Sequence, residues 1–228
     1  MKTIGLIGGM SYESTLSYYE IINKLTNEKL GKLHSAKIVL TSVDFEEIEE
    51  CQRKNDWQKA SEILTQHALL LQKCGVDFIL ICTNTMHKCY ENIQKNIQIP
   101  ILHIAKAMLL ELQNQNINKV LLLGTKYTMT EDFYKQLLIA SKIEVFIPKK
   151  DDIVIVNDII FNELCKGIIN EESKRYFDDL IVQFPQVQGV ILGCTELGLI
   201  IKENSKKLFD SAYIHAKMAV LKALENKR

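Results

Sequence analysis

Two short polar segments, each placed directly after an apolar run, carry the residue types best suited to chemistry. The first is Cys82–His87 (CTNTMH), which follows the run Val76–Ile81, and the second is Gly193–Glu196 (GCTE), which follows Val187–Leu192. Short apolar runs that end in polar residues are typical of buried strands, and the Thr, Asn and Glu residues are typical of helix starts. One hydroxyl or thiol on each side of a small substrate could move protons on opposite faces of a single carbon.

Cys194 has two interpretations that the residues leave open. A cysteine at the end of a buried strand is by default a small apolar side chain of the core. Against this, Gly193 allows a ligand or backbone to approach closely, and Thr195-Glu196 predict a helix start. The positive end of a helix dipole would lower the pKa of the Cys194 thiol and populate the thiolate. Core packing and catalysis therefore both remain open for this residue.

The segment Thr83-Asn84-Thr85 is also open to two interpretations. Its polarity is explained by a cap that ends a strand, but three adjacent hydroxyl and amide groups would equally suit a small anionic ligand. Because strand neighbours point to opposite faces, only one of Cys82 and Thr83 can face such a ligand. The turn Gly8–Thr15 lacks the G-x-G-x-x-G spacing and the lysine of nucleotide-binding loops, so its N–H groups suit a carboxylate better than a nucleotide.

Several other polar residues have ordinary structural explanations. Gln52 could orient a ligand, although an exposed helix or loop glutamine is the more common case. Lys166, directly before Gly167, is by default a solvated cation near a helix end. The acidic run Glu46–Glu50 is typical of a solvated helix face. For the scattered histidines, spacing alone favours structural roles: His34, His87, His103 and His215.

Composition excludes several classes of protein. The chain has 228 residues, 47% of them hydrophobic, and its 28 basic residues balance 28 acidic ones. A chain without net charge has no electrostatic attraction for nucleic acid or a membrane surface. The apolar runs fall short of the ~20 residues that a membrane span needs, and the first of them is too short for a signal peptide.

The six cysteines show no paired C-x-x-C spacing. The sequence therefore indicates neither a zinc site nor a disulfide framework, and nothing in it points to an organic cofactor. We expect a soluble, cytoplasmic protein whose partner is a small molecule.

Short β-branched runs alternate with longer amphipathic stretches along the whole chain. The predicted strands are Thr3–Ile7, Lys37–Leu40, Phe78–Ile81, Ile101–Ile104, Val120–Leu123, Ile143–Ile147 and Val190–Leu192. The predicted helices are Tyr12–Leu30, Trp57–Lys73, Ala105–Gln113, Glu131–Ala140, Ile153–Cys165, Lys174–Phe184 and Ala212–Glu225. This alternation predicts an α/β fold in which parallel sheets are covered by helices on both faces.

A weak internal echo predicts two similar halves. Thr3–Gly9 (TIGLIGG) and Lys119–Thr125 (KVLLLGT) each begin a half, and each half later delivers one of the two polar segments. We expect a first domain of residues 1–99 plus 211–228 and a second domain of residues 100–210, facing each other across a cleft. Pro100 marks the expected crossing.

On these motifs the chain resembles the cofactor-independent aspartate/glutamate racemase family over nearly its whole length. The matching pieces, in order, are Ile4–Met10 (IGLIGGM), Asn84–His87 (NTMH), Leu123–Thr125 with Thr128, and Gly193–Glu196. Through Gly9–Thr15 (GMSYEST) and Cys82–His87 it is similar to a bacterial branch that racemises L-aspartate and L-glutamate. The resemblance implies two pseudo-symmetric α/β domains with an interdomain cleft and proton transfer at the α-carbon without pyridoxal phosphate (PLP).

The resemblance also implies roles for single residues. Cys194 matches the family's second catalytic cysteine, which faces the α-hydrogen of the L-substrate. The first catalytic cysteine normally stands directly before Asn-Thr, and in this chain that position is Thr83, with Cys82 one residue early. The departure puts the symmetric two-thiol mechanism in doubt.

The resemblance also implies the residues that bind the substrate. Asn84, Thr85 and Thr195 match positions that hold the substrate's α-carboxylate and amino groups, and Gln52 is similar to a substrate contact of the same branch. Lys166 resembles a lysine that holds the side-chain carboxylate in some aspartate racemases. The predicted substrate site is completed by Met10, Thr125 and Thr128.

Together these positions predict an asymmetric racemase of acidic amino acids. Cys194 would remove the α-proton of the L-enantiomer, while Thr83, whose hydroxyl is a poor base at neutral pH, would supply or relay a proton on the opposite face. The alternatives are another reaction of the superfamily, such as maleate isomerisation or hydantoin racemisation, and a non-catalytic protein that binds small carboxylates. The family resemblance also suggests a homodimer.

Overall fold

The computed structural model describes residues 1–225 and divides the chain into two α/β units. The first unit comprises Met1–His103 together with the C-terminal segment from His215, and the second comprises Ile104–Ile214. The expected domain boundaries, after residues 99 and 210, lie slightly earlier in the chain than the boundaries of the structure, which follow His103 and Ile214. Within residues 1–225, no helix combines the length and the apolar character that crossing a lipid bilayer requires.

The first unit contains a parallel sheet of four strands in the order β2-β1-β3-β4. Its elements are β1 (Ile4–Gly8), α1 (Tyr12–Leu30), β2 (Ile38–Ser42), α2 (Phe45–Arg53), α3 (Trp57–Lys73), β3 (Phe78–Ile81), η1 (Thr85–Cys89), α4 (Tyr90–Gln94), β4 (Ile101–Leu102) and most of α11 (Ser211–Leu224). Helix α1 begins where the Ser11 hydroxyl accepts a hydrogen bond from the N–H of Ser14, a typical N-cap.

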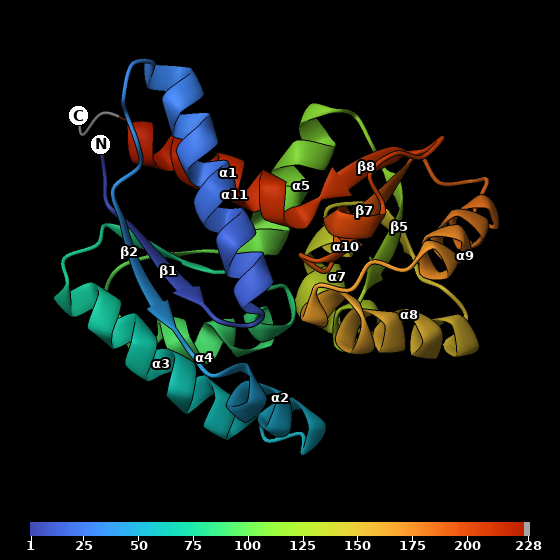
Figure 1. The fold of residues 1–228 in the computed structure, drawn as a ribbon, viewed down its shortest axis with the longest axis horizontal. Coiled ribbons are helices and arrows are strands. Elements are labelled where there is room, and N and C mark those ends of the chain that lie inside the picture. Colours follow the sequence, from blue (N-terminus) through green and yellow to red (C-terminus); the bar gives the residue numbers. More distant parts are fainter. Residues whose placement is uncertain (226–228) are drawn as a thin grey trace. The chain divides into compact units, whose positions relative to one another are not determined.

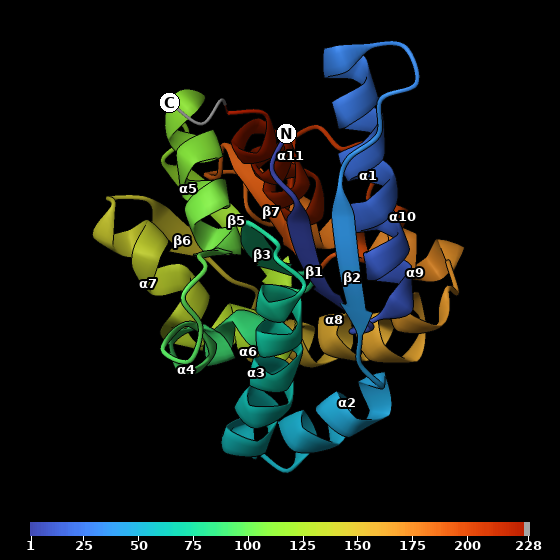
Figure 2. The same ribbon diagram turned by 90° about the vertical axis from the view of Figure 1, so that its left-hand side faces the viewer.

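Helices cover both faces of this sheet, as Figure 1 shows and the turned view in Figure 2 confirms, with α1 and α3 on opposite sides. Ile7, Ile79 and Ile81 point to one face, where they form a buried cluster with Leu64 and Leu71 of α3. Every second residue of β1 and β3 points to the other face, which α1 and α11 cover. This double cover explains why the central strands are continuous apolar runs.

The second unit repeats this topology with the order β6-β5-β7-β8, again all parallel. Its elements are α5 (Ile104–Asn114), β5 (Lys119–Gly124), α6 (Lys126–Thr130), α7 (Asp132–Ala140), β6 (Glu144–Phe146), α8 (Lys150–Asn162), η2 (Leu164–Lys166), α9 (Glu171–Val182), β7 (Gly189–Gly193), α10 (Leu197–Ile200) and β8 (Lys207–Asp210). In both units the second strand along the chain lies at one edge and the first and third lie at the centre. The predicted fold class, two domains built on parallel sheets with helices, is confirmed.

The core of the second unit also lies between sheet and helices. Leu121 and Leu123 of β5 form a buried cluster with Val156 and Ile160 of α8 and with Phe177 of α9. Helices α5 and α7 contact each other and lie on the other side of the sheet (Figure 2).

Three differences from the expected elements have physical causes. Strand β8 was not expected, because four residues with an exposed Lys207 at an edge give too short a pattern. Helix α2 was noted only as an acidic run, since its apolar positions are few. The strand expected over Ile101–Ile104 ends at Leu102, and Ile104 instead begins α5.

Strand β8 gives a test of the fold, because Phe209 packs directly onto Gly189 of β7. A Cβ at Gly189 would lie 2.5 Å from Phe209 Cε2 and 3.0 Å from the Lys207 carbonyl oxygen. We expect Gly189→Ala to lower the free energy of unfolding by about 1–3 kcal/mol, the usual cost of overpacking, as measured by urea denaturation. The same change in a Phe209→Leu background should cost less, since the shorter side chain leaves room. Equal costs in the two backgrounds would contradict the β7–β8 packing.

Candidate active site

In the first unit, the predicted residues lie at the carboxyl ends of the central strands β1 and β3. Ile7 pairs with Ile81, so Gly8 and Cys82 leave the sheet side by side. The N–H of Cys82 donates to the carbonyl of Ile7 (2.9 Å), and its own carbonyl accepts from the Ser14 hydroxyl (2.8 Å). Ligands of α/β proteins commonly bind at this edge of a parallel sheet.

The structure distinguishes Cys82 from Thr83. Cys82 is fully buried, and burial raises the pKa of its thiol. Thr83 is only half-buried, and its carbonyl accepts a 2.8 Å hydrogen bond from Nδ1 of His87. Of the two residues, Thr83 is therefore the one that is partly accessible to solvent.

The Thr83 loop rests on a group of buried aromatic and imidazole rings. The rings of His87 and His215 lie 5.7 Å apart, and His87 also contacts His103 at 4.8 Å. His215 bonds the Tyr18 hydroxyl through Nδ1 (2.8 Å) and the Leu102 carbonyl through Nε2 (2.9 Å). Burial lowers the pKa of His87 to about 4, and burial together with His87 lowers the pKa of His215 to about 3. Both rings are therefore neutral at neutral pH and support the loop as hydrogen-bonding groups.

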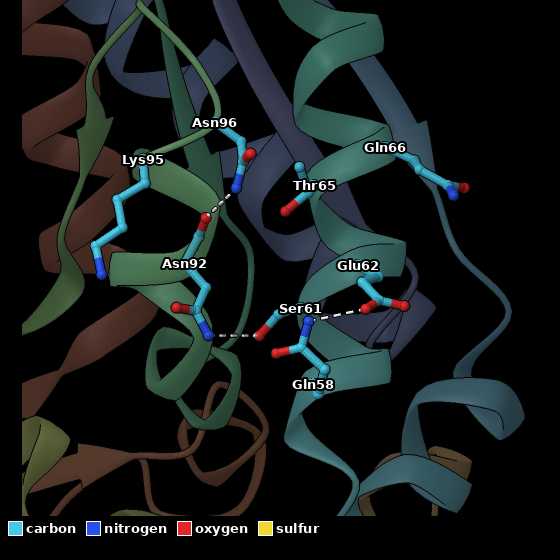
Figure 3. Close-up of a pocket in the computed structure, with 8 residues that line it drawn as sticks. All are labelled: Gln58, Ser61, Glu62, Thr65, Gln66, Asn92, Lys95 and Asn96. Carbon is cyan, nitrogen blue, oxygen red and sulfur yellow. Dashed lines mark hydrogen bonds between the residues drawn. The ribbon is translucent and has the colours of Figure 1, made fainter.

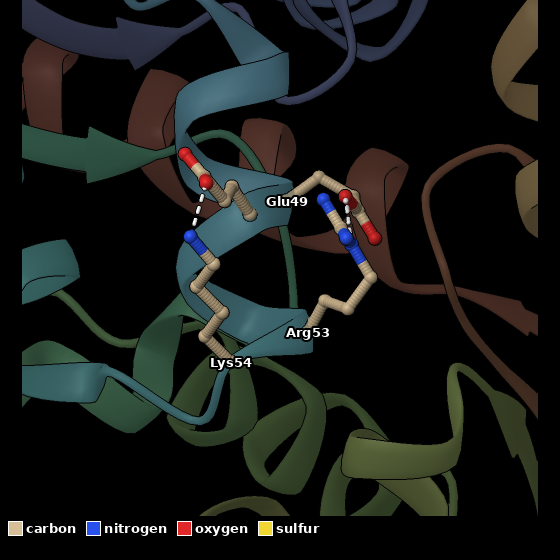
Figure 4. A network of polar contacts seen from close by, with 4 residues as sticks. Glu49, Arg53 and Lys54 are labelled. Atoms are coloured by element: carbon tan, nitrogen blue, oxygen red, sulfur yellow. Dashed lines mark hydrogen bonds and ion pairs between the residues drawn. The ribbon is translucent and has the colours of Figure 1, made fainter.

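Gln52 is buried, which contradicts the interpretation of this residue as an exposed glutamine. Helix α2 turns its acidic and basic side chains outward, where Glu49 pairs with Arg53 at 3.3 Å and Glu50 pairs with Lys54 (Figure 4). The opposite face carries Gln52, which is 4% exposed and donates from Nε2 to Met86 Sδ at 3.1 Å. The acidic run is thus a solvated face, and the helix connects Gln52 to the η1 segment.

The other predicted residues of the first unit are buried at the same edge. Met10, in the turn between β1 and α1, belongs to the apolar cluster that also includes Met86. Asn84 and Thr85 are 2% and 4% exposed, and the Asn84 carbonyl accepts from the N–H of His87. The first unit therefore brings Met10, Gln52 and the Thr83–Thr85 segment toward one end of its sheet.

In the second unit, two glycines let the central strands meet closely. Gly124 of β5 pairs with Gly193 of β7, and a Cβ at Gly124 would lie 2.8 Å from the Gly193 carbonyl oxygen. Thr125 and Cys194 therefore leave the sheet next to each other. Thr125 caps α6 by accepting from the N–H of Thr128 (3.4 Å), and the two hydroxyls lie 3.3 Å apart.

Cys194 forms a buried hydrogen-bonded group with Thr195 and Glu196. The Cys194 thiol donates to Glu196 Oε2 at 2.9 Å, and the Thr195 hydroxyl donates to the same oxygen at 2.7 Å. All three residues are nearly inaccessible, at 7%, 6% and 3% exposed. The carboxylate is thus held against the thiol within one short segment.

The expected lowering of the Cys194 pKa is wrong. Burial, the charge of Glu196 and the thiol of Cys165 raise that pKa well above its ordinary value. Helix α10 has only four residues and begins at Leu197, so its dipole is small and does not start at the thiol. The resting side chain is therefore a protonated thiol.

Lys166 lies at the end of η2 and is exposed. Gly167 follows in the left-handed conformation with φ 71° and ends the turn. The preceding residue, Cys165, packs against the apolar cluster that contains Cys194. This segment therefore belongs to the surroundings of Cys194 within the second unit.

Glu196 is the functional candidate that the sequence interpretation left out. It was noted only as part of a helix start, and an isolated Glu after Thr is ordinary at such a position. The signal that could have identified it is its spacing, since an acidic residue two positions after a candidate thiol can turn back to reach it.

A hollow of about 420 Å³ lies between α3 and α4. Figure 3 shows the residues that line it. Its lining is polar and includes Ser61, Glu62, Asn92 and Lys95, with Asn92 donating to the Ser61 hydroxyl at 3.5 Å. It contains none of the residues predicted for catalysis or substrate binding, so it is separate from the candidate active site.

The buried histidines predict a loss of stability in acid. In the unfolded chain both His87 and His215 would have a pKa of 6.5, whereas in the folded chain the pKa is about 4 for His87 and about 3 for His215. The unfolded state therefore binds more protons than the folded state as the pH falls below 6.5. Each neutral buried histidine then lowers the free energy of unfolding by about 1.4 kcal/mol per pH unit until its folded pKa is reached.

The matched test compares His215→Gln with His34→Gln, an exposed control, in urea denaturation from pH 6.5 to 4.5. We expect the His215 variant to lose about 1.4 kcal/mol per pH unit less than the wild type, because one titrating group has been removed. The control should follow the wild type. An unchanged pH dependence in His215→Gln would contradict the neutral, buried state of this ring.

Comparison with known proteins shows the family to which the chain belongs. The sequence profile of the Asp/Glu/Hydantoin racemase family matches residues 7–219. The broad-specificity amino-acid racemase RacX of Bacillus subtilis is 27% identical over 228 residues, covering 95% of this chain and 96% of RacX.

Two crystal structures are similar at the level of fold and sequence. A protein of Yersinia pestis, assigned as a candidate Asp/Glu racemase, is 46% identical with a TM-score of 0.90, covering 99% of this chain and 100% of that one. An aspartate racemase homologue from Pyrococcus horikoshii is 36% identical with a TM-score of 0.86 and the same coverage. The chain therefore belongs to the Asp/Glu/Hydantoin racemase family.

Proposed function

We propose that this protein is a PLP-independent racemase that interconverts the L- and D-enantiomers of aspartate and glutamate by α-proton transfer. The observation that carries the proposal is the Cys194 thiol, held in a buried hydrogen bond at the carboxyl end of β7. Membership of the racemase family and similarity to RacX, named as a broad-specificity amino-acid racemase, support an amino acid as the substrate.

Cys194 acts on the α-hydrogen of the L-enantiomer in this proposal. The α-proton of an amino acid is very weakly acidic, so its removal needs a base in a water-poor site and donors that stabilise the developing negative charge on the carboxylate. Cys194 lies in such a site, since it is nearly inaccessible to solvent. A thiol can take up and release the proton with little reorganisation.

Thr83 acts on the opposite face of the same carbon. Its hydroxyl donates a proton, or relays one from water, but it is a poor base at neutral pH. Cys82 does not replace it, because its thiol is fully buried in the core. The two faces of the substrate therefore meet groups of different acidity.

The remaining predicted residues bind the substrate. Asn84, Thr85 and Thr195 hold the α-carboxylate and amino groups, and Lys166 holds the side-chain carboxylate, which is the basis for acidic substrates. The other proposed contacts are Met10, Gln52, Thr125 and Thr128. Met10, Asn84, Thr85, Thr125 and Thr195 follow the carboxyl ends of central strands, where parallel sheets commonly bind ligands, and this supports their assignment.

We extend the proposal to a cytoplasmic location and to a homodimer. All six cysteines are free, which fits a reducing compartment. The homodimer follows from the family resemblance.

Thermodynamics limits how unequal the two directions can be. The enantiomers have equal free energy in water, so kcat/KM must be the same for both in a true racemisation. The asymmetry between Cys194 and Thr83 therefore acts on kcat and KM separately, or on the exchange of protons with solvent before turnover.

The first test is α-proton exchange in heavy water, followed by NMR, with L- and D-aspartate and L- and D-glutamate supplied separately. We expect exchange from the L-enantiomers with accumulation of D-product on a chiral column. Cys194→Ser should lower this exchange by 10²-fold or more, because the serine hydroxyl is a much weaker acid than a thiol. A lack of exchange from all four amino acids would overturn the proposal in favour of another reaction of the family or of a binding protein.

The second test addresses the opposite face. Thr83→Cys should raise exchange from the D-enantiomers by about tenfold or more, since a thiol forms its conjugate base far more easily than a hydroxyl does. Thr130→Cys, which adds a thiol at an exposed position, is the control and should leave exchange unchanged. If D-side exchange stays constant in Thr83→Cys, Thr83 does not act on that face.

A further inference from the structure

Glu196 is a buried acidic residue in direct contact with the proposed catalytic thiol. It is 3% exposed, and its Oε2 accepts hydrogen bonds from the Cys194 thiol (2.9 Å) and the Thr195 hydroxyl (2.7 Å). Both donors are its neighbours in sequence, so the arrangement is built by one turn of the chain at the carboxyl end of β7.

Stability does not explain this arrangement well. Burying a carboxylate costs several kcal/mol unless strong donors compensate, and although the Thr195 hydroxyl is a good donor, the thiol is a weak one. The charge of Glu196 also raises the pKa of Cys194, so the carboxylate makes a free thiolate scarcer at neutral pH. A residue that only had to populate the thiolate would be basic, and a residue that only had to fill space would be apolar.

We propose that Glu196 is the proton acceptor of Cys194, so that the thiol becomes a base only at the moment when its own proton moves to Oε2 of Glu196. The inference rests on the proposed racemase function. On the L-face the S–H bond breaks and an O–H bond forms on Glu196, while the α-C–H bond breaks and its proton forms a new S–H bond. The electron pair of the C–H bond stays with the substrate as the stabilised carbanion, so atoms and charge balance.

Thr195 is a positioning residue in this scheme. Its hydroxyl proton is committed to Glu196 Oε2, which keeps that oxygen directed at the thiol. The oxygen of Thr195 is then left as an acceptor, which suits the ammonium group of an amino-acid substrate better than its carboxylate.

The test replaces Glu196 with glutamine, which has a similar shape but cannot accept the thiol proton. Two readouts are compared from pH 6 to 9: α-proton exchange from L-aspartate and L-glutamate, and alkylation of Cys194 by iodoacetamide, followed by peptide mass spectrometry. Exposed Cys74 is the internal reference for the reagent. Glu203→Gln makes the same chemical change at an exposed position seven residues along and is the matched control.

The proton-acceptor role predicts that the two readouts move in opposite directions. Removing the negative charge of Glu196 should make Cys194 react faster with iodoacetamide, whereas exchange at pH 7 should fall by roughly 10²–10⁴-fold, the usual contribution of a general base. Exchange in Glu196→Gln should then rise about tenfold per pH unit, because the thiolate must now form by losing its proton to solvent. The control should match the wild type in both readouts.

Other outcomes overturn the inference in distinguishable ways. If exchange rises together with alkylation, or keeps the wild-type rate and pH profile, Glu196 has only an electrostatic or structural role. If the wild type shows no exchange from any of the four amino acids, the proposed function fails and the inference fails with it. Should Glu196→Gln not fold, as judged by circular dichroism, Glu196→Asp replaces it in the test. The shorter carboxylate should retain part of the wild-type exchange, and this exchange should not rise tenfold per pH unit. No exchange in a folded Glu196→Asp would contradict the acceptor role.

Discussion

The close parallel pairing of β5 with β7 is the constraint on which the candidate active site of the second unit depends. Gly124 and Gly193 face each other where the strands end, and a side chain on either would meet the backbone of the other strand at 2.8 Å. Because the strands stay paired to their last residues, Thr125 and Cys194 emerge together. The chain can then turn immediately, and that turn brings Glu196 back to the thiol. A bulkier residue at either glycine would separate these groups.

Burial controls the charge state of nearly every titratable group near the two polar segments. Loss of water raises the pKa of Cys82 and lowers the pKa values of His87 and His215, so all three are neutral in the folded protein. The resulting hydrogen bonds are fixed and support the backbone of the Thr83 loop. At Glu196, Oε2 accepts hydrogen bonds from the Cys194 thiol and the Thr195 hydroxyl inside the protein. The proposed acid and base chemistry therefore depends on paired groups rather than on one free ion.

The two units share a topology but differ in the chemistry at the end of their third strand. In the first unit the thiol of Cys82 is turned into the core and Thr83 follows it, supported from behind by His87. In the second unit the thiol itself is at the end of the strand, with Glu196 as its partner. Relative to the glycine that ends the neighbouring central strand, the cysteine stands one residue earlier in the first unit. Cys82 is level with Gly8 there, whereas in the second unit Gly124 pairs with Gly193 and Cys194 comes one residue later. Successive residues of an extended chain point to opposite faces, which accounts for the difference. The proposed asymmetry between the two faces of the substrate has this structural origin.

Local patterns determined much of the fold from the sequence alone. The bounds of α1, α3 and β3 were predicted to the residue, because their apolar periods and end residues lie within each element. The two polar segments were also recognisable, since polar residues directly after a buried strand are a local signal. Short elements such as β8 and α10 were not, because β8 has a charged residue at each end instead of a continuous apolar run, and the four residues of α10 make only about one helical turn.

Tertiary structure alone decided which groups are buried and how they are protonated. Gln52 is buried because η1, more than thirty residues later, covers its face of α2. His215 is neutral because burial, together with the nearby His87, lowers its pKa. The pKa of Cys194 is raised rather than lowered, because burial and Glu196 outweigh the dipole of a four-residue helix. Sequence neighbours determine the conformation of a segment, whereas the loss of water at a side chain depends on residues that only the folded chain brings together.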